Sequence, residues 1–143
     1  MNNILRYCTA GAVFLMLSVF SSCKKDKDTV PDVYTDILLY STDPAFAPLN
    51  AITGYTYLPG GSKGVLVYRK SQNEFMAYDR HCPYNVQDGN VVTVDASGLL
   101  VEDVACSSKF LITDGTPDGT GPAINPLKYF QTSYDGTVLH IFN

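Results

Sequence analysis

Short apolar runs broken by turn residues fill the chain from residue 33 onward, and this pattern limits the folds open to it. After Cys23, no stretch repeats apolar residues with the i, i+3, i+4 spacing of an amphipathic helix. The runs are instead typical of β-strands, since turn residues bound them and β-branched and aromatic residues enrich them. They cover residues 34–40, 51–58, 64–69, 74–79, 91–95, 99–104, 110–113, 129–134 and 137–142. Many short strands at close spacing predict an all-β sandwich or barrel.

Two turn signals are the clearest in this region. The first is Pro-Gly-Gly-Ser at 59–62, between two predicted strands. The second is Asp135-Gly136, which separates two alternating segments near the C-terminus. Both residue types tolerate a positive φ, so this dipeptide predicts a β-hairpin.

Composition and charge exclude several classes of protein. The 143 residues are 45% apolar and 17% charged, and the formal net charge is −4. A nucleic-acid-binding protein would carry a basic stripe, which this chain lacks. Four cysteines are too few for a disulfide-dense miniprotein but enough for one bridge or one metal site. The chain also lacks the G-x-S-x-G, Walker and G-x-G-x-x-G motifs, so we expect no catalytic residues and no enzyme activity.

The N-terminus has the pattern of an export signal. Arg6 precedes an apolar run at 10–20, which is too short for a membrane-spanning helix of about 20 residues. Small residues and Cys23 follow, which resembles the lipobox of bacterial lipoproteins, with Phe20 in place of the more usual leucine. That resemblance implies removal of residues 1–22, including Cys8, and lipidation of Cys23. The alternative is an ordinary secretory signal followed by a chance cysteine.

The rest of the chain divides into a tether and one domain. Residues 23–32 are polar and interrupted by Pro31, which predicts a flexible tether. Residues 33–143 form one domain, because about 110 residues can bury a single core. The lipobox resemblance implies a lipoprotein of the bacterial cell envelope, periplasmic or surface-exposed, whose partners are the bilayer and an unknown envelope protein or small ligand.

Three segments together resemble a Rieske-type iron–sulfur domain. FMAYDRHCPYN at 75–85 is similar to the family's first cluster loop, normally Cys-x-His. CSSKFLITDGTP at 106–117 is similar to its second loop, normally Cys-Pro-x-His-Gly-Ser-x-Phe followed by a turn. The segment at 121–141 resembles the family's Gly-Pro-Ala, Pro-Leu and closing hairpin, and GGSKGVLVYR at 60–69 also fits. The resemblance implies stacked antiparallel sheets with two cluster-type loops at one tip.

The cluster ligands of this family are only partly kept. A Rieske cluster takes two Cys on one iron and two His on the other. The first-loop cysteine and histidine fall on Cys82 and Tyr84, and those of the second loop fall on Asp103 and Cys106. The resemblance therefore implies a degenerate member of the family that lacks the histidine ligands.

The second-loop register depends on which residues anchor it. The register above matches three family positions, namely Ser108, Phe110 and Gly115. A rival register places the second cysteine on Cys106 and the histidine on Lys109, and it loses the match at Ser108 and Phe110. Neither register supplies a histidine, and tyrosine and lysine side chains are ordinarily protonated at neutral pH.

Four arrangements of the two remaining thiols stay open. Because the family fold brings the two loops together and export reaches an oxidising compartment, the resemblance favours a disulfide between Cys82 and Cys106. Free buried thiols are the second possibility. A zinc site could be written from both cysteines with His81 and His140, although adjacent side chains on an extended loop point apart. Asp103, the two cysteines and an outside group could instead hold a [2Fe–2S] cluster.

The preferred function is a cluster-free binding or structural module of the envelope, with no cofactor and no metal ion expected. The alternative is a [2Fe–2S] electron-transfer protein with atypical ligands, acting as a subunit of an oxidoreductase. A fold can persist after its chemistry is lost, so the overall resemblance alone does not decide between them.

Overall fold

A computed structural model describes residues 29–143 of the protein. The predicted signal segment 1–22, the lipidation site Cys23 and the first part of the tether lie outside the described residues. Within the described part, no helix has the length and apolar character needed to cross a bilayer.

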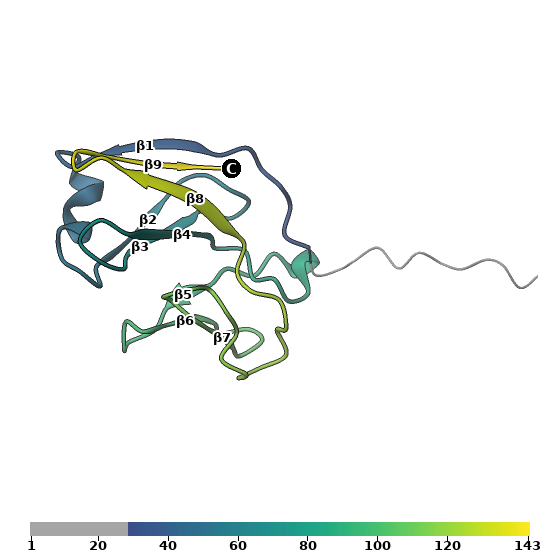
Figure 1. Ribbon diagram of the computed structural model, residues 1–143. Helices are drawn as coiled ribbons and strands as arrows, with labels where there is room; N and C mark the ends of the chain where they lie inside the picture. The colour runs from purple at the N-terminus through teal and green to yellow at the C-terminus, as the bar shows by residue number, and fades with distance from the viewer. Residues whose placement is uncertain (1–28) are drawn as a thin grey trace, which may run out of the picture.

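The described part of the chain consists of short strands and two 3-10 helices, in the order shown in Figure 1. The first half contains β1 (Asp36–Tyr40), η1 (Pro44–Asn50), β2 (Tyr55–Leu58), β3 (Val65–Arg69), β4 (Phe75–Asp79) and η2 (Val86–Asp88). The second half contains β5 (Thr93–Val94), β6 (Leu100–Asp103), β7 (Ser108–Leu111), β8 (Tyr129–Tyr134) and β9 (Val138–Phe142).

These strands form two antiparallel sheets. The larger has the order β1-β9-β8-β4-β3-β2, and the smaller has the order β5-β6-β7 and lies below it in Figure 1. In the larger sheet, β4 and β8 share only two residue pairs, so the sheet divides into two three-stranded halves joined at one corner. The predicted all-β class of stacked antiparallel sheets is confirmed.

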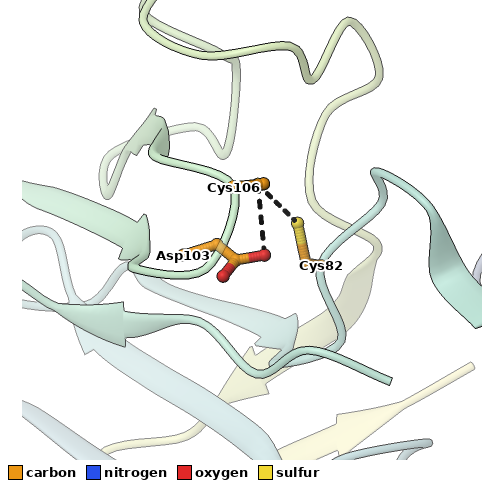
Figure 2. A group of neighbouring side chains, drawn as sticks. All are labelled: Cys82, Asp103 and Cys106. Atoms are coloured by element: carbon orange, nitrogen blue, oxygen red, sulfur yellow. Dashed lines mark hydrogen bonds between the residues drawn. The ribbon is translucent and has the colours of Figure 1, made fainter. Parts of the chain in front are cut away.

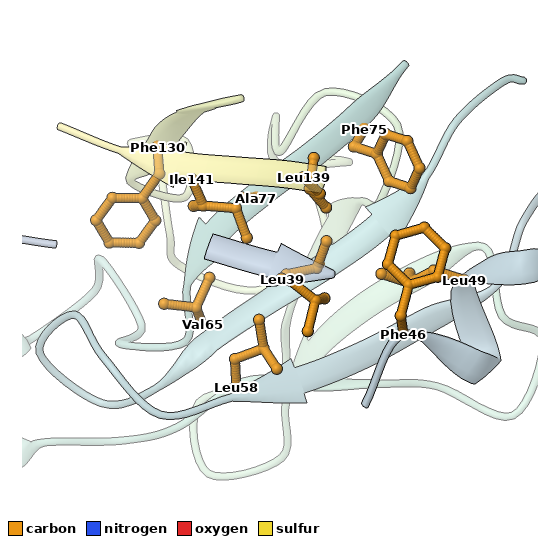
Figure 3. Packing of buried hydrophobic residues seen from close by; sticks show 11 residues of the cluster. Leu39, Phe46, Leu49, Leu58, Val65, Phe75, Ala77, Phe130, Leu139 and Ile141 are labelled. Atoms are coloured by element: carbon orange, nitrogen blue, oxygen red, sulfur yellow. The ribbon is translucent and has the colours of Figure 1, made fainter. Parts of the chain in front are cut away.

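Strand β3 explains why the domain has two hydrophobic cores. Its Val65 and Val67 face the cluster between the two halves of the large sheet, which Figure 3 shows. Leu66 and Tyr68 point the other way, into the cluster between β3, β4 and the small sheet. Successive side chains of a strand alternate between faces, so a strand buried on both faces reads as a continuous apolar run.

The predicted hairpin at Asp135-Gly136 is confirmed. It joins β8 to β9, and Gly136 has a φ of +97°. The Asp135 carboxylate accepts hydrogen bonds from the N–H groups of Thr137 and Val138, at 2.8 and 2.7 Å. The turn is therefore fixed by a residue pair whose types could be recognised in the sequence.

Several features differ from the sequence expectations. Strand β2 begins at Tyr55, four residues after the predicted start, and the short helix η2 was not predicted. Helix η1 was not predicted, because seven residues containing Pro44 and Pro48 show no helical periodicity. Strand β7 begins at Ser108, two residues before the predicted start, because residues 103 and 108 pair across the β6–β7 turn. Strand β5 is shorter than predicted, at two residues.

The end of the predicted tether lies against the domain. Val30 is buried, and the Lys128 ammonium donates to the Pro31 carbonyl at 2.8 Å and the Asp32 carboxylate at 2.7 Å. The Asn143 amide also donates to Asp32, at 3.0 Å. Residues 30–32, which the sequence placed in the tether, therefore contact the domain.

Candidate functional site

Cys82 lies in the first of the two predicted loops, just after β4. Its N–H donates to the Asn90 carbonyl at 3.0 Å, and the Val92 N–H donates to the Arg80 carbonyl at 2.8 Å. These bonds tie the two ends of the loop 83–89 together. They hold Cys82 beside the small sheet, with its side chain fully buried.

Asp103 and Cys106 come from the tight turn between β6 and β7. The Ser107 N–H donates to the Asp103 carbonyl at 2.8 Å and closes the turn. The Asp103 side chain accepts from the Ala105 N–H at 2.8 Å, which is the local bond that aspartate commonly makes in turns. Ser107 has a φ of +61°, a conformation that glycine adopts more easily. This turn directs Cys106 back over Asp103.

The two loops bring these three side chains into contact. The Sγ atoms of Cys82 and Cys106 are 3.9 Å apart, and Cys106 Sγ is 3.2 Å from Asp103 Oδ2. Their three ligand atoms all lie within 4.8 Å of one another. Figure 2 shows Cys82 approaching from one loop and the other two residues from the opposite loop. The sequence resemblance predicted this meeting of loops, and the geometry agrees with it.

Burial and hydrogen bonding set the electrostatics of the site. Burial, and secondarily hydrogen bonding to the Asp103 carboxylate, raises the pKa of the Cys82 thiol well above its ordinary value. Burial also tends to raise the pKa of Asp103. Hydrogen bonds from both thiols and from the Ala105 N–H more than offset that tendency, so the pKa of Asp103 is lowered. The site therefore holds a buried carboxylate beside a Cys82 thiol that resists ionisation.

Ser108 supports Cys106 from the start of β7. Its hydroxyl lies 3.1 Å from Cys106 Sγ, accepts a hydrogen bond from the Ala123 N–H at 3.1 Å, and is fully buried. The segment at 121–123 therefore packs directly behind the site. The sequence comparison used Ser108 only as an anchor for the register, and its contact with the thiol emerges from the structure.

His81 points away from the sulfur atoms, as the alternation of an extended loop predicts. Its Nδ1 is 2.8 Å from Ser62 Oγ, and its Nε2 is 2.8 Å from the Val86 carbonyl. A carbonyl can only accept, so Nε2 carries a proton and donates to Val86. His81 thus fastens the first loop to the turn at 59–64, and neither ring nitrogen is available to a metal ion.

His140 is also remote from the thiols. It lies on β9, partly exposed, and its Nε2 is 2.7 Å from Asp36 on the neighbouring strand β1. The two-Cys, two-His zinc set that could be written from the sequence is therefore not formed, and that alternative is wrong. His140 forms a contact between two neighbouring strands and does not serve as a metal ligand.

The structure distinguishes the two possible registers of the second loop. Lys109, the histidine position of the rival register, forms an ion pair with Glu102 at 3.3 Å on the partly exposed face of the small sheet. Asp103, which is next to Glu102 in sequence, faces the opposite way and contacts Cys106. The register that places Asp103 and Cys106 at the family's ligand positions is thus the one whose residues reach the site. Tyr84 is half-buried beside the same apolar cluster as Cys106.

The donors do not fit a [2Fe–2S] cluster as they stand. Such a cluster needs two donors on each of two irons. In this register, Cys82 and Cys106 would bind different irons, yet their sulfur atoms are already in contact. The remaining donors are a carboxylate and a phenol, which are hard ligands in place of a thiolate and an imidazole.

Comparison with known proteins supports the fold. No family model and no curated protein matches the chain. It is similar to a chain in the solved complex of reduced oxygenase and oxidized ferredoxin in carbazole 1,9a-dioxygenase, with a TM-score of 0.50 and 19% sequence identity. The match covers 73% of this chain and 93% of that chain, and at this identity it shows the fold alone. The protein has a Rieske-like β fold with two thiols and a carboxylate at the loop tip.

Proposed function

We propose that this protein is a lipid-anchored module of the bacterial envelope, in which a disulfide between Cys82 and Cys106 replaces the cluster of the Rieske-like fold. The observation that carries the proposal is the 3.9 Å separation of the two sulfur atoms across the two loops. The module binds a partner and carries out no catalysis of its own. Its partner is another envelope protein or a small ligand.

The envelope assignment is supported by the N-terminal sequence. An apolar run of signal-peptide length ends in two serines and Cys23. The contacts of Asp32 with Lys128 and Asn143 begin only nine residues after that cysteine. The short segment between them would hold the domain close to the membrane surface.

Formation of the bridge requires an oxidant, which export would supply. In exchange with the disulfide of an envelope thiol oxidase, the two thiols lose two protons and two electrons and form one S–S bond. The oxidase disulfide takes up both and becomes a dithiol. The sulfur atoms must then approach from 3.9 Å to about 2.05 Å. Cys106 lies on a turn and is partly exposed, so it is the residue that can move and meet the oxidant.

Alkylation with intact-mass analysis tests the disulfide. The full chain is exported, purified in detergent, denatured without reductant and treated with a thiol-alkylating reagent. We expect neither Cys82 nor Cys106 to be labelled before reduction and both to be labelled after it. Denaturation is essential, because burial of Cys82 would block labelling even of a free thiol. Two labels without reduction would contradict the proposal.

Substitution of Cys106 by serine is expected to destabilise the oxidised protein. A bridge closing a loop of about 25 residues contributes about 3–4 kcal/mol through the entropy of the unfolded chain. Urea unfolding followed by tyrosine fluorescence measures the loss, since the chain has ten tyrosines and no tryptophan. As a control, C106S is compared with the reduced wild-type protein. The difference between their free energies of unfolding should be much smaller. Equal stability of oxidised wild type and C106S would argue against the bridge.

A second candidate function is electron transfer through a [2Fe–2S] cluster with atypical ligands. The observation that supports it is the proximity of Cys82, Asp103 and Cys106. A group from outside these three residues would have to complete the ligand set. Iron and sulfide analysis of anaerobically prepared protein tests it directly. Two irons per chain with visible absorption would establish this candidate and refute the cluster-free proposal.

Substitution of Tyr84 by histidine is not expected to create a cluster. It restores one histidine position, while the second loop still presents Asp103 and Cys106 where the family has Cys and His. After reconstitution with iron and sulfide, the variant should show the same visible spectrum and iron content as the wild type. Stoichiometric iron in this variant alone would show that the ligand register assigned above is wrong.

A further inference from the structure

We propose that Cys82, Cys106 and Asp103, when the two thiols are reduced, form a binding site for a single thiophilic divalent cation of the Zn²⁺ type. The inference deepens the proposed function and rests on it only for the choice of site, because it assigns a ligand class to the reduced form of the same residues.

The spacing of the sulfur atoms is that of two ligands on one tetrahedral ion. Metal–sulfur bonds of about 2.3 Å at the tetrahedral angle place two thiolates about 3.8 Å apart. The two Sγ atoms are 3.9 Å apart. The same separation argues against a binuclear cluster, which would have to fit between these atoms. The geometry that disfavours two irons therefore favours one ion.

Asp103 supplies the third donor from the same side. A carboxylate oxygen at about 2.0–2.2 Å from the ion would lie about 3.5 Å from each sulfur in an ideal tetrahedron. Asp103 Oδ2 is 3.2 Å from Cys106 Sγ, and all three ligand atoms lie within 4.8 Å. Its other oxygen accepts from the Ala105 N–H at 2.8 Å, which orients the carboxylate as an outer-shell bond does in metal sites. Small rotations of the side chains would complete the geometry.

The charge and chemistry of the three donors select the kind of cation. Thiolates favour Zn²⁺ over Mg²⁺ or Ca²⁺, which prefer oxygen ligands. Binding replaces two S–H protons by one divalent ion, so two thiolates and one carboxylate would leave the site with one net negative charge. Both protons pass to solvent, and no oxidant or reductant is needed.

The site is open to solvent on one side and leaves a fourth coordination position on the ion. Cys82 and Asp103 are buried and close the inner side, whereas Cys106 is partly exposed and borders solvent. Three protein ligands leave one position of a tetrahedron for water or for a side chain of a binding partner. No described histidine is placed to fill it, since His81 is held by Ser62 and Val86 and His140 lies with Asp36.

Titration of the reduced full chain with Co²⁺ tests the site. Co²⁺ is a spectroscopic probe for tetrahedral zinc sites, and bound thiolates give a charge-transfer band in the near ultraviolet. We expect saturation at one Co²⁺ per chain, intense visible d–d bands typical of tetrahedral geometry, and loss of both features on adding one equivalent of Zn²⁺. Absence of the thiolate band with both thiols reduced would overturn the proposal.

Three variants assign the ligands. Asp103→Asn keeps an oxygen acceptor for the Ala105 N–H but removes the anionic donor, and should weaken Co²⁺ binding at least tenfold. Cys106→Ser should lose about half of the charge-transfer intensity. Glu102→Gln, on the opposite face of β6, is the matched control and should bind as the wild type does. An affinity of Asp103→Asn for Co²⁺ equal to that of the wild type would contradict the proposed ligand set. Urea unfolding of each metal-free variant shows whether a loss of Co²⁺ binding comes from the missing ligand or from misfolding.

The two proposals fail in different ways. If the exported protein contains the disulfide but its reduced form binds no Co²⁺, the metal site is refuted and the disulfide module stands. If the exported protein retains free thiols and binds one Co²⁺, the disulfide is refuted and the metal site stands. Bound Zn²⁺ should also protect the partly exposed thiol of Cys106 from alkylation in the folded protein, which is a readout independent of colour.

Discussion

Substitution of Asp79 by alanine is expected to lower the free energy of unfolding by about 4 kcal/mol. The Asp79 carboxylate is fully buried at the end of β4. It accepts hydrogen bonds from the N–H groups of Ser62 at 2.6 Å, Lys63 at 3.2 Å and His81 at 2.9 Å. Alanine would leave three backbone donors without their acceptor, one of them buried at His81 and two partly buried at Ser62 and Lys63. A buried donor without a partner costs about 1–3 kcal/mol, and the partly buried ones cost less because water can reach them.

Asp79 also connects the turn at 59–64 to the loop that carries Cys82. Its removal should therefore loosen the site, and the reduced variant should alkylate faster at Cys82 under native conditions. Urea unfolding measures the stability change. Asp118→Ala is the matched control, because Asp118 accepts one N–H, from Thr120, in an exposed turn. Similar losses in the two variants would contradict the role assigned to Asp79.

Substitution of Gly121 by alanine is expected to lower the free energy of unfolding by about 3 kcal/mol. Gly121 has a φ of +78°, which L side chains adopt at a cost of about 1 kcal/mol. A Cβ atom there would lie 2.6 Å from the N and Cα atoms of Ser108. Because these are backbone atoms of β7, the strand or the 121–123 segment would have to shift, and overpacking of this kind costs about 1–3 kcal/mol.

Gly119→Ala separates the two contributions at Gly121. Gly119 has a φ of +88° in the same loop, and a Cβ atom there would meet nothing within 4 Å. This control should lose about 1 kcal/mol, the conformational part alone. Since Ser108 contacts Cys106, Gly121→Ala should also change the native-state alkylation rate of Cys106 in reduced protein, whereas Gly119→Ala should not. Equal effects of the two substitutions on stability would refute the close-approach argument.

The strands could be predicted because their determinants are local. Strand β3 is a continuous apolar run, so the apolar pattern locates it. Asp135-Gly136 lies between β8 and β9, so turn chemistry locates that hairpin. Helix η1 could not be found this way. Its seven residues contain two prolines, and burial of Phe46 and Leu49 against the large sheet is what holds it.

The candidate site could be predicted in part from the sequence, and the rest required the tertiary structure. The resemblance to the Rieske-type loops singled out Cys82, Asp103 and Cys106. His81 could be doubted as a ligand because adjacent residues of an extended loop point apart. The sequence favoured Asp103 over Lys109 through the matches at Ser108, Phe110 and Gly115, but it could not show which of the two side chains reaches the cysteines. That depends on which face of β6 and β7 packs inward, and the burial of Asp103 and the Lys109–Glu102 pair decide it.

The sequence by itself determined most of the strands and the hairpin, because these follow from local backbone preferences and turn chemistry. The residues at the loop tip were indicated by the resemblance of their segments to the Rieske-type loops. Only the tertiary structure decided that two sulfur atoms lie 3.9 Å apart with a buried carboxylate beside them. That distance joins residues 24 positions apart. It is set by the packing of the small sheet on β3 and β4 and by the bonds of Asp79 and His81 to Ser62, which join residues far apart in the sequence.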